Sequence, residues 1–394
     1  MSSDPPFDLR SKLTALARTP FATLLHIFLR RMFHGSDSGA GDTDDGQLDL
    51  GVGIISILLL MPGLLVSLLM FEKYGSLVRY LRGELDVDPF VATIPDEYFF
   101  IVLSVVVTGI AALWRWDAIF LDRRDYTNLV PLPISLPTIF AANFCAILAF
   151  VTFLTIVVNA ASLVFFPIAV VGSQSYFSVW FRFTAGHAAA VFLASAFSFF
   201  AVFAVVGALM SVLPSKAFRR VSLLVRFVMG IVLLLLIATV LTLPELLERF
   251  KISQVQILVR LPPVSFLGIA STVWGRGHQP LIAEATFAAL LALAATIIVA
   301  TIAYAVSFRR AFLRIPETSD SSPLPQLRLS LPRMAPIERL LVRNPSQRGC
   351  FRFAIATLLR SEQHLQIVLA FSALGLVAAA ESLNTSQGLR AILS

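Results

Sequence analysis

The chain has 394 residues, of which 57% are hydrophobic and only 14% are charged. Soluble domains carry roughly 25% charged residues, so this composition, with a mean hydropathy of +0.82, excludes an ordinary soluble fold. The formal net charge is +7. Basic residues that flank hydrophobic segments usually set the orientation of a protein in a membrane. We therefore expect the positive charge to reflect a lipid bilayer as the partner, and we expect no nucleic acid.

The first 34 residues predict an amphipathic helix on the membrane surface. Residues 9–33 mix Leu and Phe with Arg and Lys at roughly helical spacing. Residues 35–50 are rich in Gly, Ser and Asp and are too polar to pack, so we expect a flexible linker. Because the first apolar run starts only at residue 51, we expect it to be a retained span and not a cleaved signal peptide.

Seven uninterrupted apolar runs follow along the chain. They cover residues 51–71, 98–114, 138–166, 185–213, 221–243, 281–308 and 365–380. A straight helix needs about 20 residues to cross the hydrocarbon core, and longer runs can tilt. The runs predict an all-α integral membrane protein, a polytopic helix bundle whose first six spans form a membrane domain at residues 51–308.

A second change of composition divides the predicted bundle. Residues 309–350 are rich in Pro, Ser and Arg and predict a cytoplasmic linker between two membrane halves. Residues 351–394 are expected to start a second half with at least one further span. Only 14 residues follow the seventh run, so we expect this half to be truncated.

The basic residues also predict the orientation of the chain. With Arg226 grouped with the loop before it, 22 of the 31 Lys and Arg residues lie on one side of the predicted spans. The richer side is expected to be cytoplasmic. This puts the amino terminus inside and predicts a multi-pass protein of the cell (inner) membrane.

No motif for catalysis or nucleotide binding is recognisable. The sequence has no phosphate loop, no dinucleotide glycine fingerprint and no His-Glu-x-x-His helix. Two cysteines cannot make a disulfide framework or a zinc site, and the five histidines are scattered among loops and span ends. We therefore predict no catalytic residue, no metal, no cofactor on this chain and no enzyme activity of its own.

The predicted spans hardly offer the buried charge that an ion-coupled carrier usually needs. Arg226, Glu284 and Glu381 lie near the ends of their runs, where their side chains can reach water. Inside the runs the polar residues are Ser, Thr, Asn143 and Asn159. Small residues at about four-residue spacing predict close helix packing, at Ala204, Gly207, Ala208 and Ser211.

One predicted cytoplasmic loop, between the second and third runs, combines an apolar face with a cluster of charges. Trp116 and Phe120 belong to the apolar face. The charged cluster consists of Asp117, Asp122, Arg123, Arg124 and Asp125. Pro131, Pro133 and Pro137 then stop the helix and rigidify the entry to the third span. From its residues alone, the loop is either a docking surface for a soluble partner or a solvated loop with cytoplasmic arginines.

The stretch WRWDAIFLDRRDYTNLVPLP resembles the loop at the same place in bacterial ABC exporter permeases of the type-2 class, where a tryptophan turn, an aspartate and arginine run and a Pro-Leu-Pro turn recur. The layout of a surface helix before six spans is also similar. The resemblance implies a coupling helix that docks against a separate ABC ATPase subunit, which binds the ATP and magnesium. It also implies a second permease copy or paralogue. The coupling role is carried onto Trp116, Asp117, Phe120, Asp122, Arg123, Arg124, Asp125, Pro131 and Pro133.

The sequence thus predicts a permease subunit that exports a substrate with ATP hydrolysed by its partner. Two other classes stay open. An ion-coupled secondary transporter needs an essential carboxylate within a span. A membrane-embedded enzyme or assembly scaffold needs His, Asp or Glu clustered at one membrane face, and only Asp117, Asp122 and Asp125 cluster in this way, beside arginines.

Overall fold

The computed structural model describes residues 19–34, 93–114, 131–171, 177–249 and 261–314, with residues 56, 57, 60, 61, 63–71, 74, 129, 347 and 350. Within these residues the regular elements are helices and no strand occurs, as the predicted all-α class requires. Four described helices are long and apolar enough to cross a membrane. The structure therefore supports a helical membrane protein.

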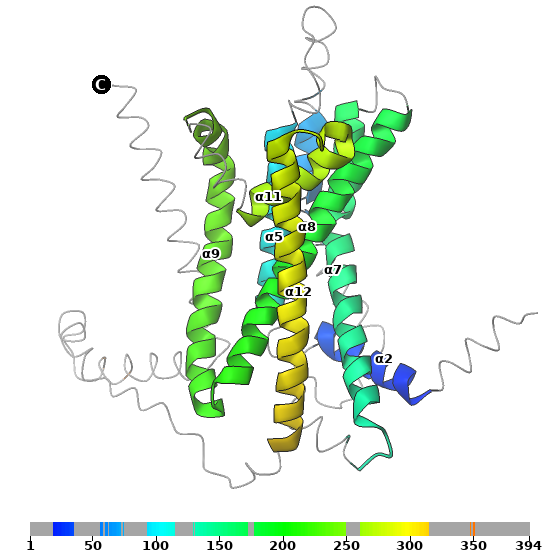
Figure 1. Ribbon diagram of the computed structural model, residues 1–394, viewed down its shortest axis with the longest axis vertical. Helices are drawn as coiled ribbons and strands as arrows, with labels where there is room; N and C mark the ends of the chain where they lie inside the picture. Colours follow the sequence, from blue (N-terminus) through cyan, green and yellow to red (C-terminus); the bar gives the residue numbers. More distant parts are fainter. Residues whose placement is uncertain are drawn as a thin grey trace, which may run out of the picture.

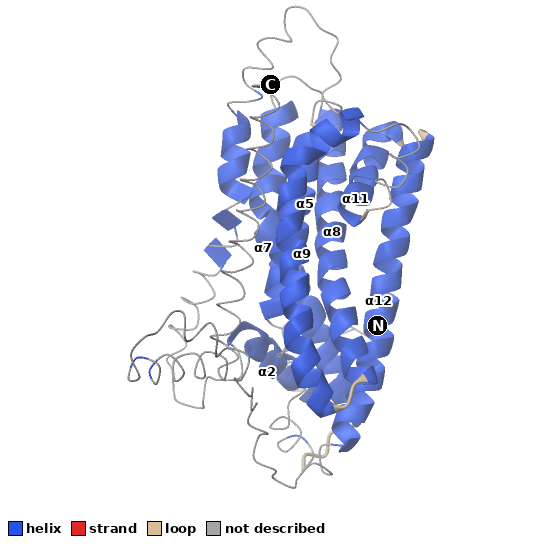
Figure 2. Ribbon diagram, turned by 90° about the vertical axis from the view of Figure 1, so that its left-hand side faces the viewer, coloured by secondary structure: helices blue, strands red, loops and turns tan. Residues whose placement is uncertain are grey.

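The long helices stand side by side, and each runs opposite in direction to the one before it (Figures 1 and 2). They are α5 (Ile94–Trp114), α7 (Leu136–Val171), α8 (Phe177–Val212), α9 (Ser215–Arg249) and α12 (Pro280–Arg314). The candidate spans are α5, α7, α8 and the Pro280–Ser307 part of α12, and they match the apolar runs predicted at 98–114, 138–166, 185–213 and 281–308. Helix α9 carries a shorter apolar stretch, Leu224–Ile237.

Only some of the predicted six spans and the linker lie within the described residues. The run at 221–243 lies in α9, and the run at 51–71 is helical at the positions that are described. Residues 35–50, the seventh run at 365–380 and nearly all of 309–350 lie outside the described residues.

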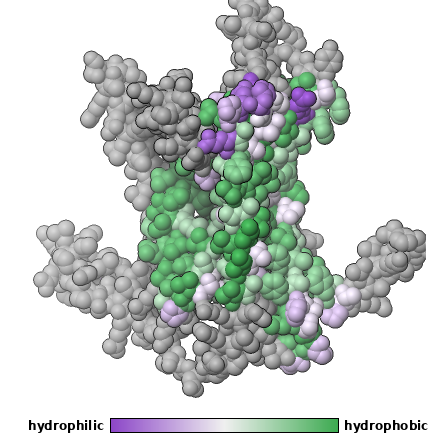
Figure 3. Space-filling view, in the orientation of Figure 1, coloured by the Kyte–Doolittle hydropathy of each residue, from purple (hydrophilic) through white to green (hydrophobic). Residues whose placement is uncertain are grey.

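Length and surface character both fit a bilayer. Helices α7 and α8 have 36 residues each, or about 54 Å at 1.5 Å per residue, against a hydrocarbon core of about 30 Å. They must tilt or project beyond the core. Hydrophobic residues cover the middle of the face seen in Figure 3, and hydrophilic residues gather towards its upper end.

We name the two ends of the bundle after the short helices that lie there. The α11 end holds the starts of α5, α8 and α12, the end of α7, and α11 (Pro262–Ser271). The α2 end holds the opposite ends of those helices and α2 (Pro20–His34).

Helix α2 lies across the start of α7 (Figure 1). Thr19 caps it, because the Ala22 amide donates to the Thr19 hydroxyl at 3.3 Å, and Pro20 occupies the first helical position. Leu24, Phe28 and Met32 are spaced by four residues and are all buried in one cluster with the first turns of α7. Helix α2 thus covers residues 20–34 of the segment predicted as an amphipathic helix on the membrane surface, and one of its faces is buried against the bundle.

Helix α11 packs inside the bundle against α5, α8 and α12. It continues into one wide turn of π-helix, Thr272–Arg276, in which Gly275 has a φ of 98°. Only glycine adopts this conformation without strain, so Gly275 lets the chain turn into α12. The stretch between the apolar runs at 221–243 and 281–308 thus contains a short helix packed into the bundle.

The small residues of α8 allow α12 to approach closely. A Cβ built on Gly207 would lie 2.8 Å from the Ala303 Cβ of α12, and the Ser307 hydroxyl donates to the Gly207 carbonyl at 3.1 Å. Such contact needs a residue without a side chain. The close packing predicted at Gly207 is confirmed.

Candidate functional site

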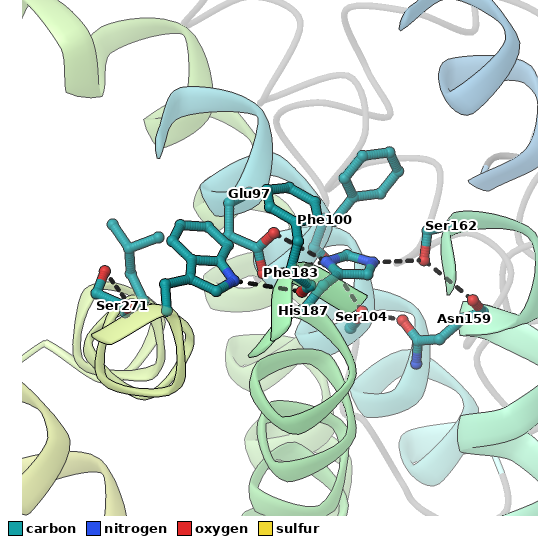
Figure 4. A network of polar contacts seen from close by, with 10 residues as sticks. Glu97, Phe100, Ser104, Asn159, Ser162, Phe183, His187 and Ser271 are labelled. Carbon is teal, nitrogen blue, oxygen red and sulfur yellow. Dashed lines mark hydrogen bonds and ion pairs between the residues drawn. The ribbon is translucent and has the colours of Figure 1, made fainter. Parts of the chain in front are cut away.

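An ion pair is buried between α5 and α8, towards the α11 end (Figure 4). The Nδ1 atom of His187 lies 2.9 Å from one carboxylate oxygen of Glu97 and 3.1 Å from the other. Both side chains are 0% exposed. Buried charged side chains in membrane-spanning segments are rare and costly, so this pair is the first candidate for a functional site.

The start of α5 places Glu97 in the bundle. The helix begins at Ile94, and the Glu97 amide donates to the Thr93 carbonyl at 2.9 Å. Asp96 and Glu97 are therefore in the first turn, where the helix dipole favours a negative charge. The α8 helix crosses α5 here and supplies His187 from its third turn.

From His187 the polar contacts continue into α7. Its Nε2 atom lies 3.2 Å from the Ser162 hydroxyl, which is 3.0 Å from the Asn159 carbonyl (Figure 4). The Asn159 amide nitrogen donates to the Thr155 carbonyl at 2.9 Å and to the Ser195 hydroxyl of α8 at 3.2 Å. One chain of polar side chains thus joins α5, α7 and α8.

A hydrogen bond joins Nδ1 of His187 to the Glu97 carboxyl group, because these atoms lie within 2.9 to 3.1 Å of each other. At the other ring nitrogen, Nε2 and the Ser162 hydroxyl can each act as donor or acceptor, depending on the tautomer of the ring. The two side chains therefore share a proton between them inside the bundle.

Aromatic rings surround the pair. The rings of Phe100 and Phe166 stand edge to face with the His187 ring, at centroid distances of 5.5 and 5.2 Å. Phe183 lies beside Phe166 and stacks on Trp274. All four aromatic residues are buried, so the pair sits in a medium of low polarity where an unpaired charge is costly.

A second buried polar contact lies beside the pair. The Tyr74 hydroxyl donates to the Asp96 carboxylate, and both residues are buried. Burial, together with the negative charges of Asp96 and Glu97, raises the pKa of Tyr74 above its ordinary value. Tyr74 therefore keeps its proton and acts as a donor throughout the ordinary pH range.

The α5 side of the network runs further into the bundle. Ser104 donates to the Asn159 side-chain oxygen and, at 2.7 Å, to the Phe100 carbonyl. Thr108 lies one turn further along the same helix face and is 0% exposed. Its hydroxyl has no hydrogen-bond partner among the residues that the structure describes. The polar chain therefore ends at a buried hydroxyl that is left unsatisfied.

Most of the predicted coupling residues lie outside the described residues: Trp116, Asp117, Phe120, Asp122, Arg123, Arg124 and Asp125. Pro131 and Pro133 are exposed, in the turn that leads into α7 at the α2 end. Leu132 between them is 46% exposed, and its amide donates to the Leu129 carbonyl at 3.1 Å. The two prolines precede α7 at the α2 end, whereas the Glu97 and His187 pair lies towards the α11 end. The prolines and the pair are therefore near opposite ends of the bundle.

The buried pair corrects an expectation drawn from the sequence. The spans were expected to hold hardly any charged group, because the second apolar run begins only at Tyr98 and the histidines are scattered. The helix actually starts four residues earlier, at Ile94, and draws Glu97 into the bundle. A carboxylate directly before an apolar run, with a histidine within another run, is the signal that could have pointed to the pair.

Metal binding finds no support in the described part of the chain. No group of three or more His, Cys, Asp or Glu side chains there is placed to hold a metal ion. Comparisons of the chain with protein-family models, curated proteins and solved structures gave no match. Functional inference therefore depends on the residues and their geometry.

Proposed function

We propose that this chain is the membrane permease subunit of an ATP-binding cassette exporter, which moves a substrate across the cell membrane with ATP hydrolysed by a separate ATPase subunit. The observation that carries the proposal is the arrangement at the α2 end. There an amphipathic surface helix packs on the same first turns of α7 that follow the Pro131 to Pro133 turn. A partner docked on the preceding loop would contact both.

The turn at the α2 end is suited to transmit force from the loop before α7 to the helix itself. The first turn of α7 follows directly, because the Ser135 carbonyl accepts from the Thr138 amide at 3.0 Å, and the Ser135 hydroxyl lies 2.7 Å from that of Thr138. The exposed prolines before it have fixed φ angles. A push on the loop before α7 would therefore move the helix and not be absorbed in the turn.

The push would then reach the far side of the bundle. The cluster that buries Phe28 of α2 also contains Phe203 of α8 and Tyr304 of α12. The Asn143 amide of α7 donates to the Tyr304 hydroxyl at 2.6 Å. Packed interiors transmit displacement because they have few voids. Such coupling suits a transporter that is driven from outside the membrane.

The test is co-purification of the solubilised full-length chain with candidate ATPase subunits from the same cell. Asp122→Ala combined with Arg123→Ala, and separately Leu132→Glu, should abolish ATPase binding. Leu261→Glu is the matched control for Leu132→Glu, because Leu261 is 52% exposed, also precedes a proline and lies at the α11 end. If no ATPase co-purifies with the unaltered chain, the proposal fails.

A second candidate function, ion-coupled secondary transport, is favoured by the Glu97 and His187 pair. Proton-coupled carriers place carboxylates and histidines inside their spans, where they bind and release the coupling ion. Flux into proteoliposomes separates the two candidates. A carrier would be driven by a pH gradient without ATP, and Glu97→Gln would stop the flux, whereas an exporter would need the ATPase and ATP.

A further inference from the structure

We propose that Glu97 and His187 together form a proton-binding site, which takes up one proton and thereby changes the contact between the two side chains. The step is a simple protonation. One proton is added to the pair, and no other bond is made or broken. The site goes beyond the proposed transport function and does not depend on what energy source drives it.

The burial of the pair makes its charge state sensitive to one proton. Both side chains are 0% exposed, so both have lost their hydration. The attraction between two buried charges repays that loss only when the geometry is good and the remaining hydrogen bonds are made. Adding one proton to the pair therefore changes the net charge of a site that is shielded from water.

The pair has aromatic rings on one side and polar groups on the other. The rings of Phe100 and Phe166 stand edge to face with the His187 ring, and the Ser162 hydroxyl lies 3.2 Å from Nε2. Asp96, adjacent to Glu97 along the chain, is also buried, at 7% exposed.

Among the described residues, the charged and titratable groups near this end of the bundle include Tyr74, Asp96 and Tyr98 at or beside the start of α5, Arg182 on α8, Arg276 in the π-helical turn, His278 before α12 and Glu284 on α12. The Tyr98 hydroxyl is 2.8 Å from that of Thr239 on α9. Tyr74 is held protonated as the donor to Asp96. A guanidinium nitrogen of Arg182 lies 3.5 Å from the Cβ position of Gly275, in the turn before α12. Helices α7 and α11 contribute no charged residue.

Polar side chains continue from the pair into the bundle. They are Ser162, Asn159, Ser104 and, one turn further along α5, Thr108, whose buried hydroxyl has no partner among the described residues. The hydroxyl groups can turn their hydrogen bonds when the pair gains a proton.

Trp274 is a natural reporter of the site. Its Nε1 atom would be 2.3 Å from a Cβ built on Gly186, the residue before His187, so the indole lies directly on this turn of α8. Opening the pair frees His187 and shifts the surface on which the indole rests. The chain has four tryptophans, and replacing Trp114, Trp116 and Trp180 with Phe leaves Trp274 as the only fluorophore of its kind.

The experiment is a pH titration of this single-tryptophan protein, full length and reconstituted in lipid nanodiscs. We expect a reversible shift of Trp274 emission on acidification, and loss of that shift in Glu97→Gln and His187→Gln. Glu284→Gln is the control and should keep the shift, because it removes a carboxylate on α12 outside the network. In protein with ¹³C-labelled histidine, the His187 resonance should move with the same midpoint as the emission.

Two outcomes would overturn the proposal. One is a Trp274 emission and His187 resonance that stay constant over the pH range in which the unaltered protein remains folded, because the pair would then be a static structural contact. This test needs only the single-tryptophan protein to fold and no substitution in the pair. The other is a shift that survives in Glu97→Gln. Neither readout involves an ATPase, so neither result contradicts the proposed exporter function, which the co-purification experiment tests separately.

Discussion

Trp274 stacks on Phe183 with the two rings nearly parallel, at an interplanar angle of 7° and a centroid distance of 5.0 Å. The indole nitrogen also donates to the Phe183 carbonyl at 3.2 Å. A residue of the π-helical turn is thereby fixed to α8 one turn before His187. This contact holds the short α11 segment against the helix that carries the buried pair.

Gly186→Ala should destabilise the protein through this contact. The new Cβ would be 2.3 Å from the Trp274 nitrogen and 3.0 Å from the Ala270 carbonyl oxygen, so the indole or α11 must move. Overpacking of this kind costs about 1 to 3 kcal/mol. The free energy of unfolding of the detergent-solubilised chain measures the effect.

Gly230→Ala is the matched control for that substitution. Gly230 is also a helical glycine, in α9, but none of the described residues comes within 4 Å of its Cβ position. Here alanine should stabilise the helix by about 0.5 to 1 kcal/mol, because glycine loses more backbone entropy on folding. Equal effects of the two substitutions would show that Trp274 is not held against Gly186.

Asn159→Ala should weaken the packing of α7 on its two neighbours. Asn159 contacts Ser104 of α5 and Ser195 of α8 from one side chain. Polar contacts between membrane helices contribute about 0.6 to 2 kcal/mol each, so a loss of about 1 to 3 kcal/mol is expected in the free energy of unfolding. Thr152→Ala, on the same helix, serves as control, since its exposed hydroxyl bonds only to the Leu148 carbonyl. If both substitutions cost the same, the contacts made by Asn159 add no stability.

Phe28→Ala should loosen α2 from the bundle without unfolding the spans. Phe28 is 2% exposed and packs in the cluster of the α7 start, whereas its neighbour Ile27 is 53% exposed. Truncating a buried Phe costs about 3 kcal/mol or more. Hydrogen exchange of the α2 amides should become at least tenfold faster in Phe28→Ala and stay unchanged in Ile27→Ala. Protection of α2 that is equal in both variants would contradict the observed packing.

The parts of the fold that could be predicted from the sequence are those that depend on local interactions alone. A backbone in lipid must satisfy its own hydrogen bonds, so an apolar run of sufficient length becomes a helix whatever its neighbours are. The spacing of Leu24, Phe28 and Met32 defined the buried face of α2 in the same way. The packing of α2 on α7 is a tertiary contact, and it depends on residues more than a hundred positions further along the chain.

The buried pair was beyond such reasoning because its partners are 90 residues apart in sequence. Nothing local distinguishes His187 from a histidine at a span end, and Glu97 falls just outside the apolar run that follows it. Only the crossing of α5 and α8 brings them together. Gly207 shows the contrast, because a small residue within a row of small residues indicates close approach even when its partner is unknown.

A double-mutant cycle on Glu97→Gln and His187→Gln should give a large coupling energy. Removing either partner leaves the other charge buried and unpaired, which costs about 3 to 5 kcal/mol, whereas the double variant leaves two neutral groups. The double variant should therefore be more stable than the sum of the single losses by about 2 kcal/mol or more.

The comparison is the neighbouring pair of Tyr98 and Thr239, whose hydroxyls lie 2.8 Å apart between α5 and α9. Its cycle, made with Tyr98→Phe and Thr239→Val, joins two neutral groups and should give no more than about 1.7 kcal/mol. Both cycles use thermal or denaturant unfolding of the same purified chain. A coupling at Glu97 and His187 as small as that of the neutral pair would mean that the two side chains do not carry opposite charges in the bundle.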